Sequence, residues 1–260
     1  MFQNTNSLRP PCFRGFWVHS LKTSDKVLRY GENNQVEFSE HPTVVQRGNE
    51  RTINIYAAKT LDASQGIIHH REGIDLLPSN IELSGFEVRL INAMSRERVL
   101  KTYVNEVKKN YDYVLIDCMP SLGMITINAL AAADSVIIPT QPHYLSAKGL
   151  ELLLRSVSRV KRQINPKLRI DGILMTMVMP RTNISKEITA TVKSAYGKKI
   201  KVFDTEIPHS IRAVEATAEG KSIFAYDKSG KVAAAYEQLG KEVAEIGEKQ
   251  RNQNRADRIR

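Results

Sequence analysis

The sequence predicts an α/β fold, a doubly wound and mostly parallel sheet flanked by helices. From about Gly66 onward, short apolar runs alternate with amphipathic stretches of helical length, and this alternation is typical of a parallel sheet covered on both faces. Val114, Leu115 and Ile116 form the kind of apolar run found in a strand that is buried on both faces. The length of 260 residues is sufficient for one such domain.

Each element of this fold is predicted from a change in the period of the apolar residues. Short apolar runs bounded by turn residues predict strands, and apolar residues three or four positions apart predict helices. Strands are expected at 73–77, 111–117, 135–139, 170–178 and 201–203. Helices are expected at 83–94, 100–107, 122–133, 146–163, 184–196 and 232–248.

By composition the chain divides into three parts. Residues 1–65 combine scattered aromatic residues with turn signals and lack sustained periodicity, so we expect a divergent, weakly ordered N-terminal segment. Residues 66–248 form the regular α/β part. Residues 249–260 form a basic C-terminal tail.

Asp117 stands at the carboxyl end of the buried strand, where open α/β sheets bind their ligands. A carboxylate in this position can hold a hydrated Mg²⁺ beside phosphates, although an aspartate that merely ends a strand is the more common case. Pro120 ends the strand, and Ser121 is expected to be the N-cap of the next helix. Cys118 is expected to be a small buried residue rather than a reactive thiol.

Several function classes have no support in the sequence. No stretch approaches the roughly 18 apolar residues needed to span a bilayer, so we expect a cytoplasmic protein with no membrane partner. The two cysteines form neither a disulfide framework nor a metal-ligand spacing. His69 and His70 have no carboxylate or cysteine at a useful spacing, and His143 is expected at the surface. There is no nucleophile elbow of a serine hydrolase.

A set of longer segments carries a family resemblance. The segments are GIDLLPSNIELSGFE, YDYVLIDCMPSLGMITINALAAADSVIIPTQ, KRQINPKLRIDGILMTM, RTNISKEI, VFDTEIPHSIRAVEA and AYEQLGKEV. In their order and spacing, from Gly73 to about Val243, the chain resembles the ParA/Soj branch of the MinD-like ATPases, the deviant Walker family that partitions plasmids, mobile elements and chromosomes. The resemblance covers about two thirds of the chain and implies a P-loop NTPase-like fold.

The resemblance also implies an opening strand and a KGGxGK[ST] phosphate loop, and the sequence contains neither. Such a loop needs glycines, because residues without a Cβ let consecutive N–H groups turn toward an anion. Gly220, Lys221 and Ser222 end like this loop, but its first glycine and the preceding strand are absent. Residues 57–60 (Ala-Ala-Lys-Thr) also end like this loop, but they contain no glycine. Residues 61–66 resemble the family's second acidic segment, but they follow residues 57–60 too closely for the family's spacing.

The matching motifs imply site residues for the family cofactors, ATP and Mg²⁺. Asp117 matches the magnesium-side aspartate, and Met177 and Pro208 match places where the family wraps the nucleotide base. Without the loop, the chain retains Asp117 but lacks the donors that stabilise the transferring phosphoryl group. We therefore expect no ATP hydrolysis.

The missing strand would leave a gap in the sheet, since in the family it lies beside the strand that ends in Asp117. Each unpaired backbone group inside the protein would cost about 1 to 3 kcal/mol, which is large against a net stability of about 5 to 15 kcal/mol. We expect Thr52 to Ala57 to fill the gap. Otherwise the free chain would be only marginally folded.

The net charge of +10 and the pI near 9.6 favour a polyanionic partner without specifying which one. Six cations and no acid lie from Arg155 to Arg169, a run most simply explained as a solvated helix face. The resemblance favours nonspecific DNA, with Arg212 at the arginine of the family's IPRNVR segment and His209 in place of that segment's first arginine. Further expected DNA contacts are Lys193, Lys198, Lys199 and Lys221.

The resemblance implies protein partners as well, namely a ParB-like protein and a dimer with a second copy or with full-length ParA. The apolar stripe from Leu150 to Val160 is compatible with core or with a dimer surface, and we expect core. Three functions stay open: a partition ATPase homologue unable to hydrolyse ATP, a non-hydrolysing DNA- or partner-binding module, and a nonfunctional remnant of a rearranged parA-like gene. Retained DNA binding would imply association with the nucleoid.

Overall fold

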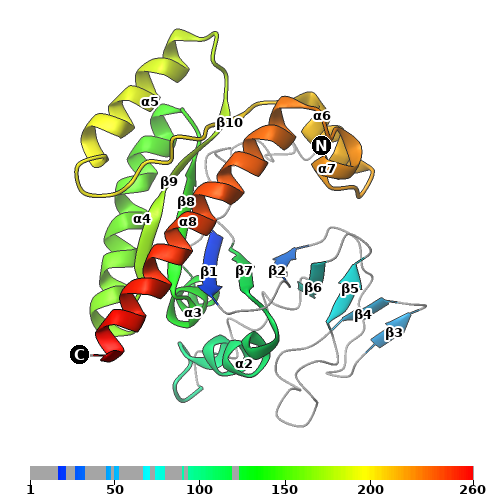
Figure 1. Ribbon diagram of the computed structural model, residues 1–260, viewed down its shortest axis with the longest axis vertical. Coiled ribbons are helices and arrows are strands. Elements are labelled where there is room, and N and C mark those ends of the chain that lie inside the picture. Colours follow the sequence, from blue (N-terminus) through cyan, green and yellow to red (C-terminus); the bar gives the residue numbers. More distant parts are fainter. Residues whose placement is uncertain are drawn as a thin grey trace, which may run out of the picture. The chain divides into compact units, whose positions relative to one another are not determined.

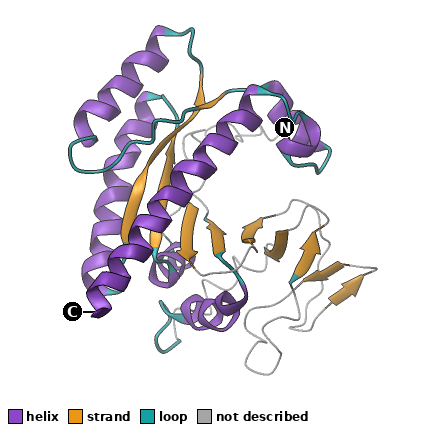
Figure 2. Cartoon of the chain, viewed as in Figure 1, coloured by secondary structure: helices purple, strands orange, loops and turns teal. Residues whose placement is uncertain are grey.

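The computed structural model describes residues 17–21, 27–32, 45–47, 50–52, 67–70, 74–79, 90, 93–118 and 123–259 (Figure 1, Figure 2). These residues form two compact units. The N-terminal unit contains the described residues up to Ile137 together with 153–170, and the C-terminal unit contains 138–152 and 171–259. Three elements run through both units: β8 (Ser135–Thr140), α4 (Tyr144–Gln163) and β9 (Arg169–Val178).

In the described part of the chain, the larger sheet has the strand order β10-β9-β8-β1-β7-β2-β6-β5. Strand β7 (Tyr113–Asp117) lies between β1 (Trp17–Leu21) and β2 (Val27–Glu32). β2 is parallel to β7 and to β6 (Ile74–Ser79). β1 is antiparallel to β7 and β8, and the edge strand β5 (Ile68–His70) is antiparallel to β6. The predicted α/β fold, with a parallel sheet flanked by helices, is confirmed, and β1 and β5 are its antiparallel exceptions.

The gap expected beside the Asp117 strand is filled by β1, so the prediction that 52–57 fill it is wrong. Thr52 ends β4 (Glu50–Thr52), which pairs with β3 (Val45–Arg47) in a separate two-stranded sheet. Residues 53–57 lie outside the described residues. Ile53 and Ile55 are residues of high strand propensity and favoured this segment over 17–21 in the sequence. Propensity alone, however, does not decide which segment pairs with a given strand.

Two helices of the N-terminal unit pack against each other. The predicted helix at 100–107 is α2 (Val99–Val107), followed by a 3₁₀ turn, η2 (Lys108–Asn110). Its buried residues have the predicted spacing: Leu100, Tyr103, Val104 and Val107. Helix α3 (Met124–Ala132) has the extended Gly123 as its N-cap, so the predicted N-cap at Ser121 is wrong because helical backbone begins later. Most of the helix predicted at 83–94 lies outside the described residues, although Leu90 is helical and buried.

Two buried asparagines complete the ends of these helices. The Asn128 Oδ1 accepts a hydrogen bond from the Leu100 N–H at 3.2 Å, and its Nδ2 donates to the Arg96 carbonyl at 2.7 Å. Asn128 thus supplies the cap that α2 does not obtain from its own N-cap residue. At the other end of α3, the Asn165 Nδ2 donates to the carbonyls of Leu130 and Ala133 at 2.9 and 2.7 Å.

In the C-terminal unit, β9 is parallel to a short strand, β10 (Ile207–Pro208). The strand predicted at 201–203 is reduced to a single bridge between Val202 and Ile173. Phe203 is fully buried there, and a Cβ on Gly172 would lie 2.7 Å from its ring. The close approach of the two segments therefore requires glycine at position 172.

The helices of the C-terminal unit are α5 (Asn183–Tyr196), α6 (Ile211–Ala218), α7 (Ile223–Tyr226) and α8 (Lys231–Ile259), with the start of α4. Leu150, Leu153, Val157 and Val160 of α4 are buried, which confirms the expectation of core for these four residues, whereas Leu154 of the same stripe is half-buried. Helix α8 is longer than predicted and includes residues 249–259 of the predicted basic tail. None of the described helices combines the length and apolar composition needed to cross a bilayer.

Candidate functional site

The carboxyl ends of β9 and β10 meet at one edge of the C-terminal unit. Pro208 pairs with Val178 in parallel register, and the His209 N–H donates to the Val178 carbonyl at 3.0 Å. Met177 directly precedes Val178, so the structure brings the two predicted nucleotide-base residues together. Because open α/β sheets bind ligands at the carboxyl ends of their strands, this edge is a candidate site.

Met177 has an unusual backbone conformation at this edge, with a φ of 53°. A left-handed conformation costs a non-glycine residue about 1 to 2 kcal/mol, and such residues cluster at ligand sites. The Met177 Sδ lies 3.1 Å from the Nε2 of Gln141, which directly follows β8. The neighbouring Thr140 is buried, and its hydroxyl has no hydrogen-bond partner among the described residues. The sequence singled out neither Thr140 nor Gln141.

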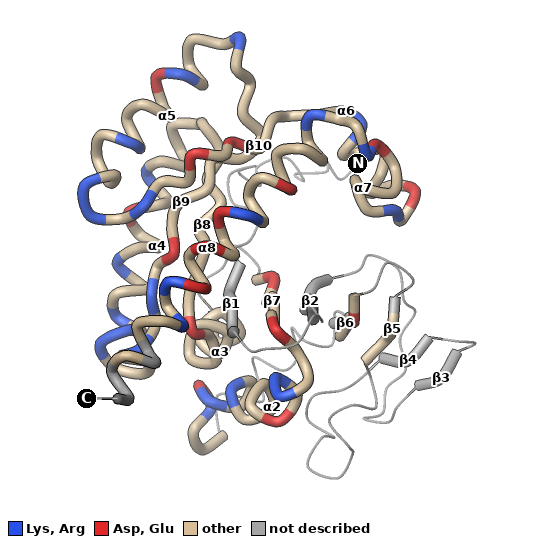
Figure 3. Tube along the Cα trace, in the orientation of Figure 1, with Lys and Arg blue, Asp and Glu red and all other residues tan. Residues whose placement is uncertain are grey.

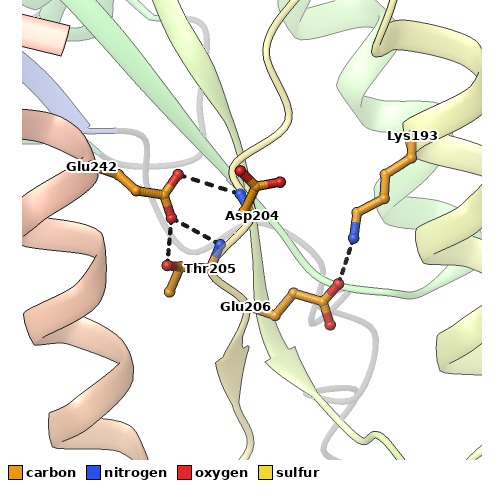
Figure 4. Close-up of polar contacts among 5 residues, drawn as sticks. All are labelled: Lys193, Asp204, Thr205, Glu206 and Glu242. Atoms are coloured by element: carbon orange, nitrogen blue, oxygen red, sulfur yellow. Dashed lines mark hydrogen bonds and ion pairs between the residues drawn. The ribbon is translucent and has the colours of Figure 1, made fainter. Parts of the chain in front are cut away.

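Glu242 of α8 holds the segment that leads into β10 (Figure 4). Its Oε1 accepts hydrogen bonds from the Thr205 N–H at 3.0 Å and from the Thr205 hydroxyl at 2.5 Å. Its Oε2 accepts from the Asp204 N–H at 3.4 Å and lies 3.3 Å from the Lys201 Nζ. Burial raises the pKa of the Glu242 carboxyl, but the bonds from Thr205, Lys201 and Asp204 outweigh it and lower that pKa below its ordinary value.

The ionised Glu242 therefore fixes the backbone three residues before Pro208. Sequence reasoning missed this residue. The available signal was an acidic residue on the apolar face of the closing helix, three positions after the buried Leu239.

Asp117 ends β7 in the N-terminal unit, where it is exposed and pairs with Trp17 of β1. The adjacent Cys118 is buried, and its Sγ donates a weak hydrogen bond to the Ile116 carbonyl at 3.8 Å. Burial, together with the charge of Asp117, raises the pKa of the Cys118 thiol. The thiol is therefore protonated at neutral pH, in agreement with the prediction of a small buried residue.

A polar cluster in the N-terminal unit was not foreseen. His69 and Asp75 are partners across β5 and β6, and the His69 Nδ1 lies 2.5 Å from the Asp75 Oδ1. The Tyr111 hydroxyl donates to the Asp75 Oδ2 at 2.7 Å, and burial together with this bond raises the pKa of Tyr111. Antiparallel pairing creates this contact, which the spacing along the chain did not reveal. Within the described ranges, no three His, Cys, Asp or Glu side chains converge as a metal site.

Arg212, the principal predicted DNA contact, is exposed on α6. Its Nε lies 3.7 Å from the Oδ2 of Asp227, the residue that follows α7. The Tyr226 hydroxyl donates to the Glu215 Oε2 at 3.1 Å, and this bond is the main reason that the pKa of Tyr226 is raised. These two contacts link α6 to α7.

The predicted lysine contacts lie on α5 and in two turns. The Lys193 Nζ is 2.8 Å from the Glu206 Oε1, and the Lys221 Nζ is 2.7 Å from the Glu219 Oε2. An acid beside a cation reduces the charge that the cation offers to DNA phosphates. The remaining two are exposed after the end of α5: Lys198 and Lys199.

The Gly220, Lys221 and Ser222 segment is a turn between two helices. It follows α6 rather than a strand, and Gly220 has a φ of 61°. The Ser222 hydroxyl accepts a hydrogen bond from the Ala225 N–H at 3.1 Å and so caps α7. This segment is therefore not a phosphate loop.

Known proteins match the chain over most of this structure. A family model described as an AAA domain matches residues 19–170. The chain is 44% identical over 176 residues to the sporulation initiation inhibitor protein Soj of Bacillus subtilis, with 68% of this chain and 69% of the relative covered. It is 43% identical over 167 residues to the chromosome-partitioning ATPase Soj of Treponema pallidum, with 64% of this chain and 65% of the relative covered.

The chain belongs to the ParA/Soj family. Its fold is shared with cobyrinic acid a,c-diamide synthase from Mycobacterium smegmatis, solved with a bound ATP analogue and magnesium. That match has a TM-score of 0.60 at 28% identity and covers 80% of this chain and 85% of the synthase chain. In this ParA/Soj member, Met177 and Pro208 lie at the same strand edge, whereas Asp117 belongs to the other unit.

Replacing Glu242 with glutamine is expected to lower the free energy of unfolding by about 1 to 3 kcal/mol near neutral pH, because an ionised acceptor is lost. Since the pKa of Glu242 is lowered from 4.5 in the native state, its stabilisation is present above about pH 4.5 and is lost as the pH falls through the native pKa. Urea unfolding of both proteins at neutral and acidic pH measures the difference. The exposed Glu245, replaced with glutamine, is the matched control on the same helix. Equal stability of wild type and Glu242→Gln at neutral pH would contradict this role.

Cys118 is expected to react with a thiol reagent at least on the order of 100-fold more slowly in the native chain than in the urea-unfolded chain, because it is buried and protonated. The measurement uses Ellman's reagent on a Cys12→Ser variant, so that only one thiol reports. Fast labelling of the native variant would show that Cys118 is accessible and would overturn its assignment as a packing residue.

Proposed function

We propose that the chain is a ParA/Soj-like homologue of plasmid, mobile-element or chromosome partitioning that does not hydrolyse ATP. The main support for this proposal is the direction of β1, which is antiparallel to β7. In a phosphate loop that serves Asp117, the preceding strand runs parallel to β7, so that its carboxyl end lies beside that aspartate. Here Trp17, at the start of β1, pairs with Asp117, and Leu21, at its end, pairs with Tyr113.

A loop that follows β1 would therefore leave from the edge of the sheet opposite to Asp117. The parallel neighbour β2 ends at Glu32 and is followed by Asn33 and Asn34, without a Gly-Lys-[Ser/Thr] sequence. Asp117 offers an oxygen ligand for Mg²⁺ in the N-terminal unit, and Met177 and Pro208 offer contacts for a base in the C-terminal unit. Among the described residues neither set is joined by a glycine loop that could donate to phosphates, so these residues do not fit a hydrolysable ATP.

Nonspecific DNA binding without hydrolysis is the second proposed function. Its support is the exposure of Arg212, Lys198 and Lys199 together with the net charge of +10. Such contacts neutralise phosphates without reading bases, so binding is expected to be steeply salt-dependent and indifferent to sequence. In a cell, a cytoplasmic chain that binds DNA in this way would associate with the nucleoid. Its proposed protein partners are a ParB-like protein and, in a dimer, a second copy of this chain or a full-length ParA subunit.

The purified chain is expected to show no Mg²⁺-dependent ATP turnover above that of Asp117→Ala, since removing even one preorganised donor costs about 100-fold to 1000-fold in rate. Phosphate release is measured for both proteins, with the chromosome-partitioning ATPase Soj of Treponema pallidum as the reference. Clear turnover that Asp117→Ala abolishes would refute the proposal. A KGGxGKT coding segment in another reading frame upstream of the gene would instead favour a nonfunctional remnant.

The cation–acid pairs permit a test of DNA binding in which one substitution is expected to lower the affinity and another to raise it. Arg212→Ala is expected to weaken binding and to reduce the salt slope by about 1, as for one lost phosphate contact. Glu206→Gln is expected to strengthen binding, because it releases Lys193 from its 2.8 Å ion pair. Arg212→Lys, which keeps the charge, is the control. Fluorescence anisotropy of a labelled duplex measures all four proteins without ATP, and equal affinities would exclude this surface.

A further inference from the structure

The second half of α4 carries cations that the structure leaves without acidic partners. Arg159, Lys161 and Arg162 on the helix and Lys167 in the following turn are exposed. None of these four, which we name the α4 basic cluster, has an ion pair within the described residues. All four belong to the N-terminal unit, and Figure 3 shows Lys and Arg recurring along this part of α4.

This cluster stands on a firmly anchored scaffold. Arg159 and Arg162 are three residues apart on the face opposite Val157 and Val160, which are 1% and 6% exposed. The turn that carries Lys167 is held by Asn165, whose side chain donates to two carbonyls of the α3 end. A fixed backbone lowers the entropy lost when long cationic side chains bind a partner.

Helix stability explains only part of the cluster. Cations in the last turn of a helix interact favourably with its macrodipole, typically by about 0.3 to 1 kcal/mol each. Lys161 and Arg162 lie in that turn, but Arg159 precedes it and Lys167 follows the helix. From residue 152 to residue 170 the sequence contains no acid that would compensate these charges.

We propose that the α4 basic cluster is a second surface for DNA phosphates, additional to the Arg212 surface and resting on the proposed DNA binding. Arg212, Lys193 and Lys221 each have an acidic neighbour in the structure. DNA must compete with that neighbour for the cation, whereas the α4 cluster offers its full charge. Each cation of the α4 basic cluster is therefore expected to contribute more to DNA affinity through counterion release than a cation with an acidic neighbour.

The surroundings of the cluster favour DNA over other anionic partners. A helix that binds a lipid surface inserts apolar side chains, and a peptide-binding surface offers apolar or aromatic anchors. The large exposed apolar residues of α4 are all in its first half: Tyr144, Leu145 and Leu152. Around the cluster, the exposed neutral residues are Pro166 and the polar Ser158 and Gln163, and the last two can donate hydrogen bonds to phosphate oxygens.

The test compares two triple variants of the full chain with equal loss of charge. One is Arg159→Gln, Lys161→Gln and Arg162→Gln, and the other is Lys109→Gln, Lys231→Gln and Lys249→Gln at dispersed exposed positions. Affinity for a duplex of arbitrary sequence is measured between about 50 and 200 mM salt. The α4 variant is expected to lose about 2 to 3 from the salt slope and on the order of 100-fold or more in affinity near 0.1 M salt. Circular dichroism and urea unfolding establish that both variants are folded.

The outcomes separate this inference from the proposed function. If both triple variants weaken binding equally, the effect is net charge and the surface is refuted. If Arg212→Ala weakens binding and the α4 variant does not, DNA binding stands and the second surface is wrong. If the wild type does not bind DNA at low salt, the proposed DNA binding is wrong and this inference falls with it. Loss of binding to polyglutamate or to phosphatidylserine vesicles, with DNA binding unchanged, would assign the cluster to another partner and overturn it.

Discussion

The pairing of β7 on both sides is the constraint on which the rest of the sheet depends. An internal strand without a neighbour leaves backbone N–H and C=O groups unpaired, at about 1 to 3 kcal/mol each. β1 meets this requirement along the whole of β7, from Trp17 opposite Asp117 to Leu21 opposite Tyr113. Hydrogen bonding can be satisfied by a strand of either direction, so the sheet does not need the strand that the family uses for its phosphate loop.

Strand direction separates the stability of this fold from its chemistry. An antiparallel neighbour pairs the backbone as well as a parallel one, but it reverses which end of the strand lies beside Asp117. The antiparallel β1 therefore completes the pairing of the ParA/Soj sheet without bringing its own carboxyl end beside Asp117. By contrast, the edge formed by Met177 and Pro208 depends on β9, β10 and the Glu242 contacts within the C-terminal unit, and none of these involves β1.

The parts of the structure that the sequence predicted are those governed by local periodicity. α2, α4 and α5 begin and end within two residues of their predicted bounds, because buried apolar residues three or four apart mark a helix wherever it packs. The parts that failed depend on partners distant in sequence. The neighbour of β7, the reduction of 201–203 to a single bridge and the His69–Asp75 contact are set by tertiary pairing, which has no signature within a short window.

The same distinction applies to the candidate sites. A motif match singled out Met177, Pro208 and Arg212, which lie at a strand edge and on an exposed helix, but it carried no information on which acids face each cation. Arg212 and Lys193 resembled Arg159, Lys161 and Arg162 of the α4 basic cluster in sequence, since all are cations on amphipathic helices. Only the structure separates them, because Asp227 and Glu206 approach the first two from other elements. The uncompensated charge on a surface, rather than the number of Lys and Arg residues, determines how strongly it attracts a polyanion.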